Sequence, residues 1–123
     1  MESFDTTVIG SGPGGYVCAI RCAQLGMKVA IVEKYNNLGG TCLNVGCIPS
    51  KSLLESSELF HKAVSDFSEH GIIASPKFDF KKMIDRKSKV VKENSDGLNF
   101  LMKKNKISVF QGIGSSNKDG DVE

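Results

Sequence analysis

The sequence lacks the features that would place it in a membrane, outside the cell or in a repetitive class of protein. No apolar run approaches the ~20 residues that span a bilayer, so we expect no transmembrane helix. The N-terminal residues 1–5 have neither a basic region nor an apolar core, so nothing marks the chain for export. There is no internal repeat and no low-complexity tract. With 123 residues, 40% hydrophobic and 24% charged, the composition predicts one soluble globular domain.

Aromatic residues are also few, at 7%, and the main basic stretch, residues 77–106, contains only Phe78, Phe80 and Phe100, which lie near its two ends and do not alternate with the basic residues along it. That stretch carries +6 from ten basic and four acidic residues, whereas the rest of the chain carries −4, for a net charge of +2. A nucleic-acid interface that binds single strands needs aromatic side chains on which bases stack. We therefore interpret the basic stretch as a solvated helix face and expect neither nucleic acid nor a membrane as a partner.

The periodicity of the apolar residues predicts an α/β fold with a parallel sheet. Short β-branched or apolar runs predict strands at 6–9, 29–32 and 107–110, and a helix is expected at 16–25 with Gly26 closing it. Two strands that flank a helix within about 30 residues predict a right-handed βαβ unit. Two long helices should follow, one ending at Gly71 and one capped by Asp79. Their expected buried faces are Leu53, Ser57, Phe60, Val64 and Phe67, and then Phe80, Ile84, Lys87, Val91, Leu98 and Leu101.

The chain's glycines concentrate around a turn between the first strand and the first helix. Gly10 permits a sharp turn, Gly12 leaves room for a pyrophosphate, and Gly15 lets the helix pack closely on the sheet. The helix N-terminus offers N–H donors and partial positive charge to phosphates. Glu33 ends the second strand, 18 residues beyond Gly15, where an acid that binds ribose hydroxyls is expected. The pattern predicts a Rossmann-like site for an adenine dinucleotide, without separating FAD from NAD.

Two of the four cysteines, Cys18 and Cys22, lie one helical turn apart on the predicted first helix. Neither a histidine nor a further cysteine is placed to complete a metal site with them. We interpret this pair as apolar packing.

Cys42 and Cys47 lie in the run GGTCLNVGCIPSK, residues 39–51. On a regular helix, positions five apart are rotated by about 140° and separated by ~7.5 Å along the axis. A disulfide needs Cα atoms about 4.4–6.8 Å apart. A bridge would therefore require a break in the helix, which Asn44 and Gly46 tolerate. Lys51 follows Cys47 by four residues and could stabilise its thiolate. A redox-active disulfide is favoured, with packing and metal binding as the alternatives.

The glycine turn, Glu33 and the cysteine run together resemble the N-terminal, FAD-binding half of the flavin-dependent pyridine nucleotide–disulfide oxidoreductases. The resemblance covers essentially the whole chain. Within this family, the run that continues with Ile48, Pro49 and Ser50 is closest to the members that reoxidise lipoyl groups. Reductases that use NADPH to reduce glutathione, a related disulfide or Hg²⁺ are the alternative within the family. An inactive FAD-binding fragment is the alternative outside enzyme function.

The resemblance implies a role for each matching residue. FAD would be bound tightly, with its pyrophosphate on the glycine turn, its ribose on Glu33, and NAD as the co-substrate. Cys42 would exchange with the dithiol substrate, and Cys47 would lie against the flavin ring with Lys51 beside it. The remaining residues expected to contact FAD are Lys34, Gly40, Thr41, Gly114 and Cys42 itself.

The resemblance also implies partners and further domains. Members of the family are several times longer, with an NAD-binding domain and an interface domain that completes the active site in a homodimer. We therefore expect residues 1–123 to be the N-terminal part of an incomplete FAD domain. The expected partners are dihydrolipoyl groups on the carrier domains of 2-oxo acid dehydrogenase complexes. The expected compartment is the bacterial cytoplasm, or the mitochondrial matrix if a transit peptide has been removed. His61 and His70 are not expected to act as the catalytic base.

Overall fold

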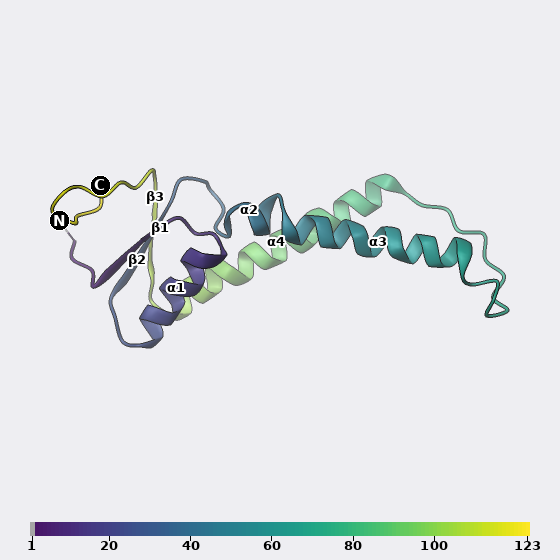
Figure 1. Cartoon of the computed structure of the whole chain (residues 1–123), viewed down its shortest axis with the longest axis horizontal. Helices are drawn as coiled ribbons and strands as arrows, with labels where there is room; N and C mark the ends of the chain where they lie inside the picture. The colour runs from purple at the N-terminus through teal and green to yellow at the C-terminus, as the bar shows by residue number, and fades with distance from the viewer. Residues whose placement is uncertain (1) are drawn as a thin grey trace.

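A computed structural model describes residues 2–123 and has two parts, a small sheet domain and a long pair of helices that projects from it (Figure 1). Both ends of the described range, residues 2–123, lie at the sheet domain, far from the tip of the helical pair. The elements in chain order are β1 (Thr6–Ile9), α1 (Pro13–Gln24), β2 (Val29–Glu33), α2 (Gly40–Asn44), α3 (Cys47–Ser65), α4 (Phe80–Lys104) and β3 (Ser108–Gln111).

The sheet is parallel throughout, in the order β1-β2-β3. Thr6 of β1 pairs with Val29 of β2, and Ala30 of β2 pairs with Ser108 of β3. The predicted βαβ unit is confirmed, as is the third strand, which starts one residue later than expected. All three strands end at the same edge of the sheet. That edge is where ligands bind in open parallel sheets.

The hydrophobic core lies between the sheet, α1 and the C-terminal half of α4. Its centre contains Ala19 of α1, Ile31 of β2 and Met102 of α4, each of which is almost completely buried. Ile107, the predicted first residue of the third strand, lies just before β3 and is buried. The core therefore joins the βαβ unit to a helix that begins 47 residues after the end of β2.

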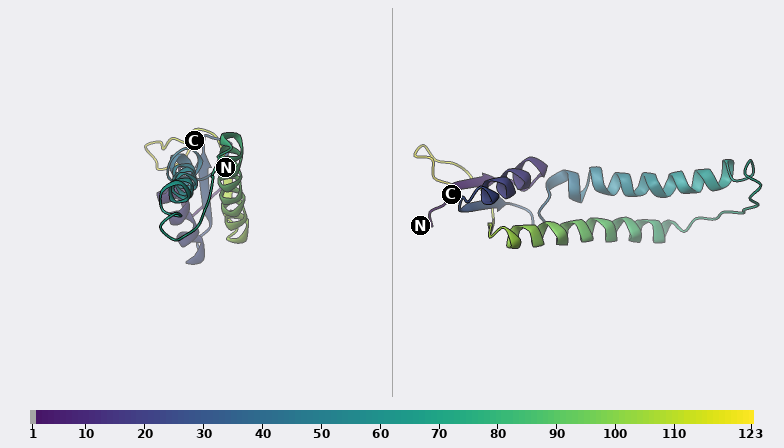
Figure 2. Two further views of the ribbon diagram at one scale, coloured as in Figure 1. Left: turned by 90° about the vertical axis from the view of Figure 1, so that its right-hand side faces the viewer. Right: turned by 90° about the horizontal axis from the view of Figure 1, so that it is seen from below.

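The helices α3 and α4 run side by side in opposite directions (Figure 2). Asp79 caps α4 as predicted, because its side chain accepts a hydrogen bond from the backbone N–H of Lys82 at 3.0 Å. The basic stretch lies on this helix. Exposed ion pairs join Lys81 to Asp85 at 2.9 Å and Lys92 to Asp96 at 2.5 Å, so the expected solvated helix face is confirmed.

The predicted buried faces of the two long helices were partly wrong. In α3, Ser57 and Val64 are exposed, and the most buried residues are Pro49 and Ser52. In α4, Phe80 is 64% exposed and Leu101 lies near the surface, whereas Ser95 and Met102 are buried. Apolar periodicity placed these faces, but serine side chains occupy part of the real interface. The first helix also begins earlier than expected, at Pro13, because proline is well suited to a first helical position.

Candidate functional site

The turn after β1 presents unblocked N–H groups at the start of α1. Gly12 is the N-cap residue of this 12-residue helix, and no side chain caps it. A Cβ atom added at Gly12 or Gly14 would meet no atom within 4 Å, so open space lies in front of the turn. Unpaired helix N–H groups beside open space form an anion site. This cradle fits the phosphates of a dinucleotide.

Gly15 has the packing role that the sequence predicts. A Cβ atom here would lie 1.9 Å from the carbonyl oxygen of Gly10 and 3.4 Å from a side-chain carbon of Val8. Only glycine therefore allows the first turn of α1 to cross so close to the end of β1.

Ser11 holds the site together, and the sequence analysis did not single it out. It is fully buried, and both its backbone N–H (2.9 Å) and its hydroxyl (2.5 Å) donate to Oε2 of Glu33. Oε1 of Glu33 accepts from the N–H of Tyr35 at 3.0 Å. Burial raises the pKa of the Glu33 carboxyl, but the hydrogen bonds from Ser11 and Tyr35 outweigh it, so the pKa lies below its ordinary value. A charged carboxylate thus fixes the glycine turn to the end of β2.

Gly39 and Gly40 bring the start of the cysteine run against the glycine turn that follows β1. The N–H of Gly39 donates to the carbonyl oxygen of Ser11 at 2.9 Å, and it lies 3.2 Å from the Ser11 hydroxyl. A Cβ atom on Gly40 would lie 2.7 Å from the Cα atom of Gly12. Two glycines in contact therefore place the start of α2 directly beside the open cradle.

Cys42 and Cys47 form a disulfide, with 4.7 Å between their Cα atoms. The helix breaks between them as anticipated, because α2 ends at Asn44 and α3 begins at Cys47. The Asn44 side chain stabilises the break by donating to the carbonyl oxygens of Leu38 (3.0 Å) and Gly40 (2.9 Å). The short loop between α2 and α3 is thus held at its α2 end by the hydrogen bonds of one side chain.

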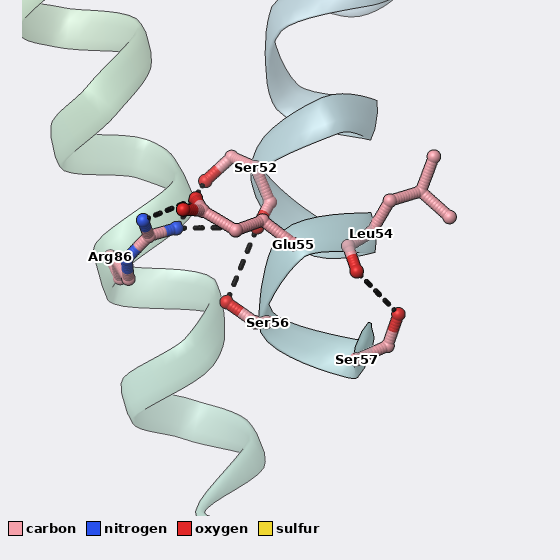
Figure 3. A network of polar contacts seen from close by, with 6 residues as sticks. All are labelled: Ser52, Leu54, Glu55, Ser56, Ser57 and Arg86. Atoms are coloured by element: carbon pink, nitrogen blue, oxygen red, sulfur yellow. Dashed lines mark hydrogen bonds and ion pairs between the residues drawn. The ribbon is translucent and has the colours of Figure 1, made fainter. Parts of the chain in front are cut away.

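The first turns of α3 are held against α4 by Arg86 (Figure 3). Its guanidinium donates to the hydroxyl of buried Ser52 at 3.0 Å, to the Ser52 carbonyl oxygen at 3.2 Å and to Glu55 at 2.7 Å. Lys51, which precedes Ser52, is exposed on the first turns of the same helix as Cys47. The Arg86 contacts therefore fix the helix that carries both residues.

The remaining predicted residues lie around the same edge of the sheet or the same loop. Gly114 lies against side chains of Ile9 and Val32, at the ends of β1 and β2. Lys34 directly follows β2, with its ammonium 4.9 Å from the ring centroid of Tyr35. Thr41 is exposed on α2, next to Cys42. Within this chain Cys42 is half-buried and Cys47 is exposed.

Other titratable residues lie outside this arrangement. His61 is exposed on α3, and His70 is exposed beyond its end. Among residues 2–123, no three His, Cys, Asp or Glu side chains gather where they could hold a metal ion. In the same described range, no helix is both long and apolar enough to cross a bilayer.

Comparison with known proteins agrees with this geometry. The family model described as pyridine nucleotide-disulphide oxidoreductase matches residues 4–122. The chain is 52% identical over 120 residues to the dihydrolipoyl dehydrogenase of Manduca sexta, a match that covers 97% of this chain and 24% of that protein. It is 50% identical over 111 residues to the mitochondrial dihydrolipoyl dehydrogenase 1 of Arabidopsis thaliana, which covers 89% of this chain and 22% of that protein.

A bacterial protein is similar to a comparable degree. Dihydrolipoyl dehydrogenase 3 of Pseudomonas aeruginosa is 48% identical over 123 residues, a match that covers 99% of this chain and 26% of that protein. The chain thus spans about a quarter of the length of the curated relatives it matches.

Proposed function

The chain belongs to the pyridine nucleotide-disulphide oxidoreductase family, and on that premise we propose that it carries the FAD-binding and dithiol-exchanging part of a dihydrolipoyl dehydrogenase. Residues 1–123 would form the N-terminal part of the FAD domain. The NAD-binding and subunit-interface domains would lie outside these residues.

One observation carries the proposal: the disulfide and the glycine turn are built as a single unit. The Gly39 N–H bonds to Ser11, and Gly40 touches Gly12, so the helix that bears Cys42 starts against the phosphate cradle. A cofactor whose pyrophosphate lies on that cradle would be held close to the disulfide, because only the short helix α2 connects the two. Electron exchange between a disulfide and a bound flavin needs this closeness.

The chain's own chemistry is thiol–disulfide exchange. One thiolate of a dihydrolipoyl group attacks the Cys42 sulfur, the bond between Cys42 and Cys47 breaks, and Cys47 leaves as a thiolate. The second substrate thiol, as its thiolate, then attacks the mixed disulfide and releases Cys42. The substrate ends as a cyclic disulfide, two protons are released to solvent or to the new thiols, and the electron pair remains on the reduced cysteine pair. The start of α3 favours the Cys47 thiolate, because a helix N-terminus lowers a thiol pKa.

The chain's residues fit FAD. Gly10, Gly12 and Gly15 would hold the pyrophosphate on the N-terminus of α1. The Glu33 carboxylate would accept from ribose hydroxyls with the lone pairs that Ser11 and Tyr35 leave open. Lys51 would lie beside the ring system, with Lys34, Gly40, Thr41 and Gly114 as further contacts. The chemistry that bound FAD supplies is the uptake of two electrons, and NAD is the proposed final acceptor.

Partners and location follow from the same relationship. The proposed substrate is the dihydrolipoyl group on carrier domains of 2-oxo acid dehydrogenase complexes, and the proposed assembly of the complete enzyme is a homodimer. The proposed compartment is the bacterial cytoplasm or the mitochondrial matrix.

Stoichiometric exchange with a dithiol tests the proposal directly. The oxidised chain is mixed with dihydrolipoamide under anaerobic conditions, quenched with an alkylating agent and weighed by mass spectrometry. We expect alkylation at Cys42 and Cys47 in addition to Cys18 and Cys22, with one lipoamide formed per chain. The Cys47→Ser variant, which cannot close the disulfide, is the control. A Cys42–Cys47 disulfide that stays closed in excess dihydrolipoamide would refute the assigned exchange.

A Gly12→Ala substitution tests the cradle. The backbone at Gly12 has φ −64° and ψ 177°, which alanine adopts without strain, and its Cβ atom meets nothing in the chain. The variant should therefore fold normally. The new methyl group occupies the space proposed for the pyrophosphate, so FAD affinity measured by flavin fluorescence should fall by 100-fold or more, a loss of about 3 kcal/mol. Unchanged affinity would contradict the placement.

A further inference from the structure

Cys18 and Cys22 form a second thiol pair that the proposed function does not use. Both belong to α1, one helical turn apart, and both are free thiols. Cys18 is exposed, whereas Cys22 is half-buried against the hydrophobic core. The pair thus offers one thiol to solvent and one that is held in place by packing.

Helix geometry keeps this pair from closing into a disulfide. Residues four apart on a helix have Cβ atoms about 5–6 Å apart, whereas a disulfide needs about 3.5–4.5 Å. The helix is continuous from Pro13 to Gln24, so closure would require unwinding it within the core layer. The Cys42–Cys47 pair differs, because there the helix is already broken between the two residues. The α1 pair therefore stays a dithiol where the other pair is oxidised.

The two thiols are nevertheless neighbours, because residues four apart lie on the same face of a helix. The neighbouring Cys22 side chain is the main cause of a raised pKa at the Cys18 thiol. Cys18 therefore holds its proton more firmly than an isolated exposed cysteine does. A ligand that neutralises both thiolates at once removes the repulsion between them.

We propose that Cys18 and Cys22 bind a soft, two-coordinate, monovalent d¹⁰ cation of the Cu(I) type. Two metal–sulfur bonds of about 2.3 Å in a line span roughly 4–5 Å, which is comparable to the ~5–6 Å between Cβ atoms four residues apart on a helix. Within the described residues, no group of three or more potential ligands exists, so a tetrahedral zinc site is not built here. Thiolates select soft cations such as Cu(I).

The binding step balances as an exchange of protons for metal. One M⁺ ion replaces two S–H protons, which are released to solvent, and the product is a bis-thiolate of net charge −1. Arg21 lies three residues after Cys18, in the last turn of the same helix, and its guanidinium partly offsets this charge. No oxidation or reduction takes place.

Ag(I) is a suitable probe because it has the same charge and coordination preference and does not reduce the Cys42–Cys47 disulfide. The oxidised chain is titrated with Ag(I) in the presence of a competing soluble thiol, and the complex is weighed by native mass spectrometry. We expect one Ag(I) per chain and simultaneous protection of both Cys18 and Cys22 from alkylation. Unchanged alkylation of either thiol at saturating Ag(I) would overturn the proposal.

Two kinds of variant separate a chelate from independent thiols. Cys18→Ala and Cys22→Ala each leave one ligand, so affinity should fall about 100-fold or more through loss of the chelate effect. The matched control, Val17→Cys combined with Cys18→Ala, keeps two thiols but places them five positions apart, rotated by about 140°. It should bind as weakly as the single-thiol variants. Equal affinity in the wild type and this control would refute chelation. The number of Ag(I) ions bound and the protection from alkylation are both measured on the wild-type chain. The test therefore does not depend on whether Cys22→Ala folds.

Discussion

Gly15→Ala is the substitution whose effect the structure specifies most closely. A Cβ atom at this position lies 1.9 Å from the carbonyl oxygen of Gly10, where real Cβ atoms essentially never come closer than 3.0 Å. The neighbouring atom is backbone, so no flexible side chain can move aside. The turn between β1 and α1 must therefore open by about 1 Å.

Three contributions set the size of the effect. Overpacking of this kind costs about 1–3 kcal/mol. Opening the turn also weakens the two bonds from Ser11 to the Glu33 carboxylate, and a hydrogen bond to a charged group is worth about 1.5–3 kcal/mol. The higher helix propensity of alanine offsets about 1 kcal/mol. We expect a net loss of about 2–4 kcal/mol in the free energy of unfolding, which lowers the melting temperature by about 10–15 °C.

Urea denaturation followed by circular dichroism measures this loss, and Gly97→Ala is the matched control. Gly97 lies inside α4, and a Cβ atom there meets nothing within 4 Å. This control should gain about 1 kcal/mol from helix propensity alone. If Gly15→Ala unfolds at the same urea concentration as the wild type, or behaves like Gly97→Ala, the close approach of α1 to β1 is refuted.

The remaining predictions concern three side-chain anchors. The pKa of Glu33 is lower in the folded chain, so its contribution to stability is complete above pH about 5 and is lost as the pH falls below the unfolded value of 4.5. The urea midpoint of the wild type should therefore fall between pH 7 and pH 4, and it should fall less in a Glu33→Gln variant. An equal fall in both proteins would contradict the assignment. Arg86→Ala should lower the free energy of unfolding by about 1–2 kcal/mol, because it leaves the buried Ser52 without its partner. Glu55→Gln removes only an exposed ion pair and should lower it by less than about 0.5 kcal/mol. Equal losses of stability in thermal melts would argue against the Ser52 contacts. Asn44→Ala removes two hydrogen bonds at the helix break and should cost about 1–2 kcal/mol in urea denaturation, so an unchanged midpoint would show that the break holds without them.

Local sequence signals determined the βαβ unit, the cap of α4 and the helix break between Cys42 and Cys47. Each depends on residues that are close in the sequence: glycines and proline at a turn, an aspartate before a helix, a glycine and an asparagine between two cysteines. Such preferences arise from backbone sterics and short-range hydrogen bonds, so they can be read without knowing the rest of the fold. The family resemblance rested on the same short segments.

Only the tertiary structure decided how these segments meet. Ser11 stands in the glycine turn as an unremarked residue, yet it is buried between Glu33 and Gly39, which lie 22 and 28 residues away. Ser52 and Arg86 lie 34 residues apart, and they place polar groups on a helix interface that apolar periodicity assigned to other residues. Hydrogen bonds between distant segments depend on the packing of the whole chain, because the partner of a buried polar group is set by which element lies opposite it. The sequence by itself therefore determined the elements and the chemistry of the site, and folding alone determined that the glycine turn and the disulfide share one anchor.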